Sequence, residues 1–379
     1  MVHLKLQNES VLSFDIDQGI YQIYREDLLP FDLRDGIQDS RDGNNLQKAL
    51  MNYRFLMDFF KNRSLSIRRE NAKKILNALH ISQTNDDTTT IKMMIMCKAL
   101  SATDDYWITE NPQERWENVN VRHNALHQVI AQISLLGSSP LTIIGPIRTP
   151  ELTGQGAYAK AWVRENNELY LVKANSKYGH ESEIEVLVSD ILDCTNVPHV
   201  PYQLVHVDGK VCSKCKDICT DDKNVVSADS VIRWCNRTDR AFFEFVLGLD
   251  PENFYKTFIV DYLIANSDRH SQNWGFYMDV KTGQLLGLHP IFDHNNAFNE
   301  AAIEPPDGGD SLMAPGRSQQ FMAQYSLKHC DFQFTKSISE DMFFDKSYFE
   351  IFQKRCATLG LNLGVGSQDH KKGFWRFVR

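Results

Sequence analysis

The sequence predicts an α+β protein made of three consecutive parts: a mostly helical N-terminal domain (1–140), a small lobe of antiparallel strands with one helix (141–235), and a larger helical lobe (236–379). In the first part, apolar residues recur every three or four positions in "NLQKALMNYRFLMDFFKNRS", which is the helical period. In the second part, short apolar segments meet at Asn166–Asn167 and at Asp208–Gly209, which are typical hairpin turns.

The bulk composition excludes several classes of protein. The 379 residues suffice for two or three domains with a substantial core. A net charge of −8 argues against a general nucleic-acid or anionic-membrane surface. No apolar run approaches the roughly 20 residues of a membrane helix. The first residues lack a cationic stretch followed by an apolar one, and the eight cysteines are scattered, so we expect a cytoplasmic protein with reduced thiols.

The individual elements follow from local patterns. In the N-terminal domain, helices are expected in 45–64, 91–102 and 120–137, the last ending at a glycine. These segments concentrate no chemistry and indicate a packing or recognition domain. In the small lobe, strands are expected in 160–166, 168–175 and 202–214, and a helix in 181–194. In the large lobe, helices are expected in 241–249, 251–266 and 346–361.

A polar cluster interrupts the apolar pattern of the large lobe. Asp268 and Asn273 lie five residues apart in "NSDRHSQN", and Asp293 follows an apolar run twenty residues later. A few hard oxygen ligands suit Mg²⁺, with phosphate oxygens completing the octahedron. The spacing is that of a kinase catalytic loop, in which the Asp accepts the proton of the substrate hydroxyl, and the Asn and a downstream Asp hold metal.

The small lobe carries residues that would hold phosphate. Gly154 and Gly156 stand in a turn before a strand, where backbone N–H groups can cradle an anion. Lys173 ends the next apolar strand, an unusual place for a cation without a partner. The following helix supplies Glu183 or Glu185 to pair with it. Each feature alone is more often structural, so the prediction depends on their order along the chain.

With these residues in place, "NSDRHSQNWGFY" and "PIFDHNNAF" resemble the HipA-like serine/threonine kinases, a bacterial family with a two-lobed protein-kinase-like fold that is distantly similar to phosphatidylinositol kinases. The resemblance covers about residues 150 to 300. It implies ATP bound between the lobes with Mg²⁺ or Mn²⁺. It also implies that Asp268 is the catalytic base and that Asn273 and Asp293 hold the metal.

The resemblance implies further nucleotide contacts. His270 and Phe292 would flank the nucleotide, and Lys173 would bind phosphate. Counting back from "NVP" (196–198) favours Glu183 over Glu185 as the partner of Lys173. Two more groups follow from it: a phosphate loop of Gly156, Ala157, Tyr158, Ala159 and Lys160, and a hinge along the adenine of Ser213, Lys214 and Cys215.

The expected activity is phosphoryl transfer from ATP to Ser or Thr of a protein, including this chain itself, and family members are often toxins paired with an antitoxin. A small-molecule or lipid-headgroup kinase and a non-catalytic pseudokinase are the alternatives. The intact set of Lys173, Asp268, Asn273 and Asp293 argues against the last. His294 and Asn295 follow Asp293 where ordinary protein kinases have Phe-Gly, which puts activation-loop control in doubt.

Two other features have competing interpretations. Cys212, Cys215, Cys219 and Cys235 invite a zinc site, but their spacing is not that of paired Cys-x2-Cys motifs, and packing with free thiols is the simpler account. The Gly/Pro-rich segment 304–320 is either a plain exposed loop or a mobile segment that carries phosphorylation sites at Ser311 or Ser318.

Overall fold

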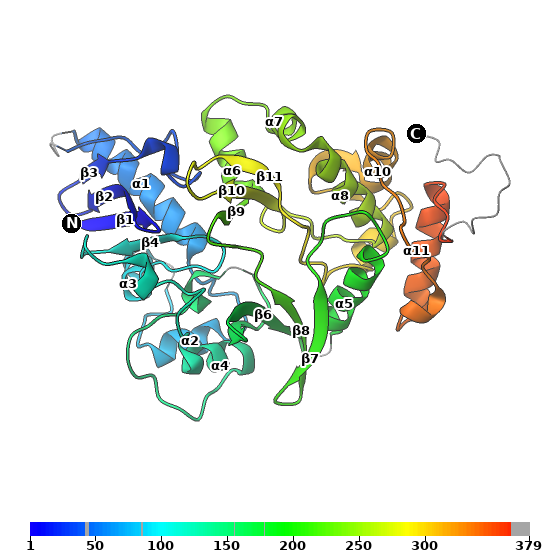
Figure 1. The fold of residues 1–379 in the computed structure, drawn as a ribbon, viewed down its shortest axis with the longest axis horizontal. Helices are drawn as coiled ribbons and strands as arrows, with labels where there is room; N and C mark the ends of the chain where they lie inside the picture. Colours follow the sequence, from blue (N-terminus) through cyan, green and yellow to red (C-terminus); the bar gives the residue numbers. More distant parts are fainter. Residues whose placement is uncertain (42–44, 85, 155, 178, 365–379) are drawn as a thin grey trace.

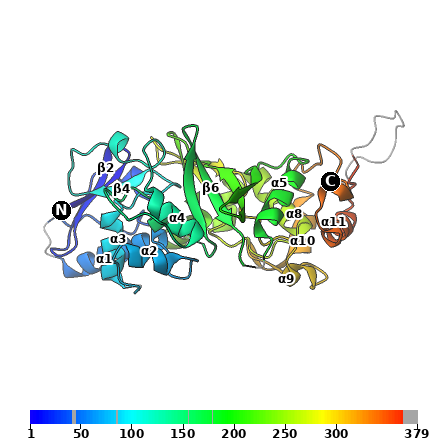
Figure 2. The ribbon, with the colours of Figure 1, turned by 90° about the horizontal axis from the view of Figure 1, so that it is seen from below.

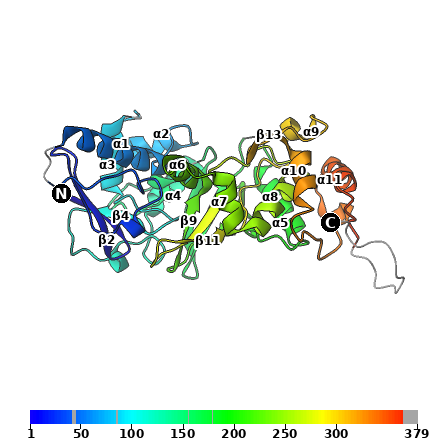
Figure 3. The same ribbon diagram turned by 90° about the horizontal axis from the view of Figure 1, so that it is seen from above.

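The structure, a computed structural model, describes residues 1–41, 45–84, 86–154, 156–177 and 179–364. Figures 1, 2 and 3 show an elongated molecule, with the first residues of the chain at one end and helix α11 at the other. The strands that form the cleft lie between these ends. None of the helices in these described ranges is long and apolar enough to cross a membrane.

The N-terminal unit (residues 1–137) combines helices with a four-stranded antiparallel sheet that the sequence analysis did not predict. Alternate residues of the first strand, Leu4 and Leu6, are buried in the core, and Gln7 turns the chain with a φ of 50°. The sheet has the order β3-β2-β1-β4. Its strands are β1 (Val2–Leu6), β2 (Glu9–Asp15), β3 (Ile20–Ile23) and β4 (Tyr106–Thr109), and the helices are α1 (Leu46–Arg63), α2 (Ala72–Ala78), α3 (Asp87–Met96) and α4 (Gln128–Leu136).

The small lobe is the expected antiparallel sheet with one helix. Asn166, Asn167, Asp208 and Gly209 all have positive φ, between 48° and 77°, which is the backbone of tight hairpin turns. The sheet order is β5-β6-β8-β7, and the helix packs against it. The elements are β5 (Lys160–Glu165), β6 (Glu168–Ala174), α5 (Glu181–Leu192), β7 (Tyr202–Val207) and β8 (Lys210–Lys216).

The large lobe is built around helix α8 (Pro251–Leu263). Asp250 caps this helix, Pro251 takes the first position, and residues 254–263 are all buried. Three strands of order β11-β10-β9 cover the side toward the N-terminal unit. The remaining elements are β9 (Lys223–Ser227), α6 (Ala228–Arg237), α7 (Phe242–Leu249), β10 (Gly275–Asp279), β11 (Leu285–Leu288), α9 (Glu300–Ile303), β12 (Asp310–Ser311), β13 (Ala314–Ser318), α10 (Gln319–Ser326) and α11 (Lys346–Thr358).

The largest apolar core joins the N-terminal unit to the large lobe. Leu4 and Phe60 of the N-terminal unit share it with Val231, Phe254 and Trp274. A second core lies under α5, α8 and α11. The N-terminal unit is therefore packed into the molecule, and the division at residues 140 and 235 stays a prediction.

The cysteines and the segment 304–320 have structural roles. Cys212 and Cys215 lie in β8 and Cys235 in α6, all free and buried, and the described residues contain no group of three or more His, Cys, Asp or Glu side chains suited to holding a metal. Part of the segment 304–320 forms the hairpin β12–β13 instead of an open loop. Within it, Ser311 is buried, and Ser318 caps α10 by accepting a hydrogen bond from the Phe321 N–H.

Candidate functional site

A cleft of about 450 Å³ lies where the small lobe, the large lobe and the N-terminal unit meet. It brings together residues that the sequence separates by more than a hundred positions. The described site residues that line it are Gly154, Gly156, Ala157, Tyr158, Lys160, Lys173, Cys215, Asp268, His270, Asn273, Phe292 and Asp293. Residues of the N-terminal unit, among them Phe31, Arg63 and Asp104, line its far side.

Lys173 is the buried cation at the centre of the cleft. Its Nζ lies 2.7 Å from Glu185 Oε1 and 2.7 Å from Asp293 Oδ1, so one ammonium joins helix α5 to the strand end of the large lobe. Glu185 also accepts a hydrogen bond of 2.6 Å from the Ser213 hydroxyl. Both carboxylates, from distant parts of the sequence, are thus fixed around Lys173.

The preference for Glu183 as the partner of Lys173 is wrong. Glu185 lies on the buried stripe of α5 that continues through Ser182 and Ser189 at helical spacing, and this stripe faces the sheet. Two residues earlier, Glu183 is turned away by about 200°. It accepts a 2.7 Å hydrogen bond from Asn175 instead.

The charged side chains around Lys173 shift one another's pKa values. Burial alone would lower the pKa of Lys173, but the carboxylates of Asp293 and Glu185 outweigh it and raise that pKa well above its usual range. Burial likewise opposes ionisation of Asp293, yet the Lys173 ammonium lowers the pKa of this carboxyl to about 2. Both groups are therefore charged at neutral pH.

Asp293 has an unusual backbone as well. Its φ of 62° is in the left-handed region, which only a few per cent of non-glycine residues adopt, although Asp adopts it more often than most, and such residues cluster at functional sites. This conformation leaves the side chain 24% exposed toward the cleft while its neighbour His294 is buried. Burial lowers the pKa of His294 well below its usual value, so the ring is neutral.

The loop that carries Asp268 and Asn273 is held by its own hydrogen bonds. The Asn273 side-chain nitrogen donates to the Asp268 carbonyl at 2.9 Å. The Asp268 carboxylate accepts from Asn296 at 2.9 Å and lies 3.8 Å from the His270 ring. Burial raises the pKa of Asp268, and the nearby Asp293 charge adds to this effect. The pair Asp268 and Asn273 thus faces the cleft beside Asp293.

Arg269 is a structural residue of this loop to which the sequence analysis gave no role. The side chain is buried and binds both carboxylate oxygens of Asp261 in α8. It also donates to the carbonyls of Phe292 at 2.7 Å and Asn273 at 3.0 Å. One guanidinium therefore fixes the loop and the segment of Asp293 to the same helix. The only signal in the sequence is a second acidic residue, Asp261, inside an apolar helix.

The predicted phosphate loop is only partly exposed to the cleft. Gly156 has a φ of 101°, which favours glycine, and Ala157, Tyr158 and Lys160 line the cleft. Ala159 does not: it is fully buried in a small apolar cluster under β5 and β6. Its main-chain carbonyl accepts from the Ala174 N–H, and the whole residue is inaccessible, which argues against the predicted nucleotide contact at Ala159.

The predicted hinge is displaced along the chain. Ser213 and Lys214 pair with Lys173 and Val172 inside the sheet, and among the described residues that line the cleft neither appears. Lys214 pairs instead with Glu165. The cleft is lined by Cys215 and the residues after it, 216–219. The strand runs farther than expected, so the connection between the lobes is residues 217–222.

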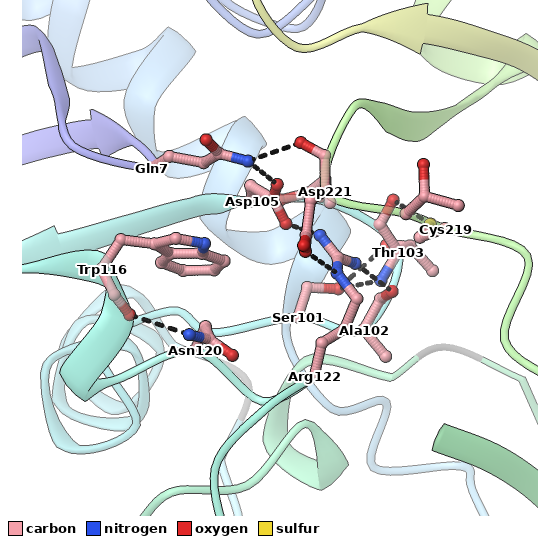
Figure 4. Close-up of polar contacts among 12 residues, drawn as sticks. Gln7, Ser101, Ala102, Thr103, Asp105, Trp116, Asn120, Arg122, Cys219 and Asp221 are labelled. Carbon is pink, nitrogen blue, oxygen red and sulfur yellow. Dashed lines mark hydrogen bonds and ion pairs between the residues drawn. The ribbon is translucent and has the colours of Figure 1, made fainter. Parts of the chain in front are cut away.

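Figure 4 shows how the N-terminal unit holds this connection. The buried Arg122 pairs with Asp105 and lies 4.0 Å from Asp217 and 3.9 Å from Asp221. Gln7 donates to the Asp105 carboxylate at 2.8 Å and to the Asp221 carbonyl at 2.7 Å. Burial raises the pKa of Asp217 to about 6 against the opposing charge of Arg122.

Comparison with known proteins identifies the fold. No protein-family model matches the sequence, and no curated protein matches it. The structure is similar to HipA from Shewanella oneidensis MR-1, solved with HipB and its operator DNA, over 95% of this chain and 96% of that one, with a TM-score of 0.51 and 12% identity. The chain has a HipA-like kinase fold.

A second similar structure is the Helicobacter pylori proinflammatory kinase CtkA, which matches 54% of this chain and 90% of that one, with a TM-score of 0.39 and 17% identity. The likeness to HipA spans all three parts of the chain, including the N-terminal unit. The α+β, two-lobed kinase-like fold expected from the sequence is confirmed. The roles of individual site residues stay predictions.

Proposed function

We propose that the protein is an ATP-dependent phosphotransferase that transfers the γ-phosphoryl group to Ser or Thr of a protein, including its own chain. The observation that carries this proposal is the ion-pair group in the cleft. Lys173 bridges Glu185 and Asp293 at 2.7 Å each, in the same cavity as Asp268 and Asn273. In protein kinases, phosphoryl transfer requires a Lys–Glu ion pair and an aspartate that holds the metal. Lys173 with Glu185, and Asp293, would fill these roles here.

The chemistry of the residues that line the cleft supports ATP with Mg²⁺ or Mn²⁺ as the proposed ligands. Since the Asn273 side-chain nitrogen donates to the Asp268 carbonyl, its oxygen is the atom offered to a metal, together with the carboxylate of Asp293. When bound, the metal neutralises charge on the phosphates. Lys160 and Lys173 are the cations placed to hold those phosphates.

The remaining residues act on the nucleotide base and the acceptor. Phe292 and the ring of His289, 5.1 Å apart, give an apolar wall suited to a base. Asp268 would accept the proton of the acceptor hydroxyl, because its pKa is raised and its carboxylate is 37% exposed. His270 lines the opening beside it.

The partner and location follow from weaker arguments. HipA was solved with HipB and operator DNA, and we propose that this chain also acts in a toxin–antitoxin pair with an antitoxin protein in the cytoplasm. Direct nucleic-acid binding by this chain is not expected, because its net charge is −8.

Intact mass of the purified protein after incubation with ATP and Mg²⁺ or Mn²⁺ tests the activity, with Asp268→Ala as the control. A phosphate-sized increase in the wild type, absent in the variant, would support the proposal. ATP binding without transfer, in the presence of protein and small-molecule acceptors, would contradict Ser/Thr kinase activity. Absence of ATP binding would identify a pseudokinase.

A further inference from the structure

A buried polar cluster lies behind the phosphate loop, on the side away from the cleft's catalytic residues. It consists of Arg69, which precedes α2, Ser134 in α4 and Glu151, which follows the N-terminal unit. Their exposed fractions are 3%, 0% and 1%. Arg69 Nη2 and Glu151 Oε2 are 2.8 Å apart, and the Ser134 hydroxyl oxygen lies 3.0 Å from the same carboxylate oxygen.

This cluster binds the end of the phosphate loop directly. Arg69 Nη2 and the Ser134 hydroxyl both donate to the main-chain carbonyl of Lys160. The other oxygen of Glu151 accepts a 2.7 Å hydrogen bond from the N–H of Trp162. One nitrogen of Arg69 and one oxygen of Glu151 thus bind the first residues of β5.

The same part of the N-terminal unit also contacts the middle of the loop and the segment before it. The Glu70 N–H donates to the Ala157 carbonyl at 2.8 Å. Arg69 Nη1 donates to the Glu151 carbonyl at 3.2 Å, and a Cβ on Gly154 would lie 3.1 Å from this nitrogen. Residues 69–70 therefore bind the loop at two points, the carbonyls of Ala157 and Lys160.

Burying an ion pair is costly unless its geometry is good and its remaining hydrogen bonds are satisfied. Here one donor and one acceptor of the pair bind the backbone of β5, at the Lys160 carbonyl and the Trp162 N–H. Phosphate binding by a loop depends on N–H groups that already point at the ligand, because reorienting them at binding costs free energy. A buried, charged brace is a physical means of fixing them.

The brace also affects the cation of the loop. Burial and the charge of Arg69 lower the pKa of Lys160 to about 7. An arriving polyphosphate would favour the charged ammonium.

We propose that Arg69 is a positioning residue, which fixes the phosphate loop to the N-terminal unit through Glu151 and the Lys160 carbonyl and so sets the affinity for nucleotide. This inference rests on the proposed function, because it assumes that the loop binds the phosphates of ATP. The N-terminal unit is then part of the nucleotide site, although it contributes none of the catalytic residues.

The test compares three variants. Arg69→Lys keeps the charge but cannot reach Glu151 and the Lys160 carbonyl together, and Ser134→Ala removes one donor to that carbonyl. Asn52→Ala is the matched control, because Asn52 is a fully buried polar residue of the same unit whose amide bonds only to Gln38 and Ser40. All three are expected to lower the melting temperature.

Two readouts separate positioning from stability. Hydrogen exchange of the nucleotide-free protein should be faster in residues 156–165 for Arg69→Lys and Ser134→Ala, and unchanged there for Asn52→Ala. Calorimetric ATP binding should weaken about tenfold for Arg69→Lys and about threefold for Ser134→Ala, as the loss of one good hydrogen bond predicts. Asn52→Ala should bind within about twofold of wild type.

The outcomes are distinguishable from those for the activity itself. Unchanged exchange in 156–165 and unchanged ATP affinity in Ser134→Ala and Arg69→Lys would overturn the inference, even if the wild type transfers phosphate. Faster exchange with weaker ATP binding would support it, even if the wild type transfers none to the acceptors tried. If Arg69→Lys does not fold, the result for Ser134→Ala tests the inference. A wild type that binds no ATP would overturn both this inference and the proposed function.

Discussion

Replacing Lys173 by Met tests the ion-pair group that defines the cleft. The variant keeps the length of the side chain but removes the ammonium shared by Glu185 and Asp293. Glu185 is 1% exposed, so its carboxylate would remain buried without its cation. Breaking a buried ion pair on one side typically costs about 3–5 kcal/mol, and we expect a loss of that size in the free energy of unfolding at pH 7.

The loss should depend on pH. Lys173 holds the pKa of Asp293 at about 2, against an ordinary value of 3.8, which corresponds to about 2 kcal/mol of stability. Because the folded pKa is the lower one, this contribution is present above pH 4 and disappears as the pH falls toward 2. Wild type and variant should therefore differ by about 1 kcal/mol less at pH 3 than at pH 7.

The assay is urea unfolding followed by tryptophan fluorescence at pH 7 and pH 3. Lys281→Met is the control, since Lys281 is 81% exposed and its pair with Asp222 is solvated, so its midpoint should not move measurably. A loss below about 1 kcal/mol at pH 7, or a difference between wild type and Lys173→Met that does not shrink at pH 3, would refute the reasoning.

Three further outcomes are expected. Asp293→Ala should reduce phosphoryl transfer at least about a thousandfold in a radiolabel assay, and near-normal turnover would contradict its role at the metal. Arg269→Met should lower the free energy of unfolding by about 3 kcal/mol, because it leaves Asp261 buried and unpaired; an unchanged urea midpoint would exclude this. Asn296→Leu removes a hydrogen bond that lowers the pKa of Asp268, so the acidic limb of the pH–rate profile should move to higher pH. A pH–rate profile that does not move would show that ionisation of Asp268 does not control the rate.

The parts of the fold that local chemistry determines were predictable from the sequence. The two hairpin turns need residues that tolerate positive φ, and Asn166–Asn167 and Asp208–Gly209 supply them. The N-capping Asp250 and Pro251 at the first helical position predict where helix α8 begins. The order of Lys173, Asp268, Asn273 and Asp293 along the chain was enough to predict that one cleft collects them.

The errors concern register and contacts between distant segments. Glu183 and Glu185 differ only in which side of α5 they occupy, and counting from a motif does not fix that rotation as well as the buried stripe does. Of the predicted hinge residues Ser213, Lys214 and Cys215, only Cys215 lines the cleft, because composition does not locate the end of a strand to within two or three residues.

Contacts across the chain left little local signal. Arg69 lies 91 residues from the carbonyl it binds, and no motif surrounds it. In the N-terminal sheet, β1 and β2 are joined by a local turn at Gln7. The strand on the other side of β1, β4, follows about a hundred residues later in the sequence. Such pairings are decided by the packing of the whole unit rather than by any segment of it.

The joint between the N-terminal unit and α6 has a consequence for the order of folding. Asp32 pairs with Arg233, and the carbonyl of Phe31 accepts from Arg237, at sequence separations of 201 and 206 residues. At a synthesis rate of about 5–20 residues per second, the first partner of each pair waits roughly 10–40 s for the second. Residues 31 and 32 therefore lack these partners until α6 (Ala228–Arg237) has been made, so this joint between the N-terminal unit and the large lobe can form only late in synthesis.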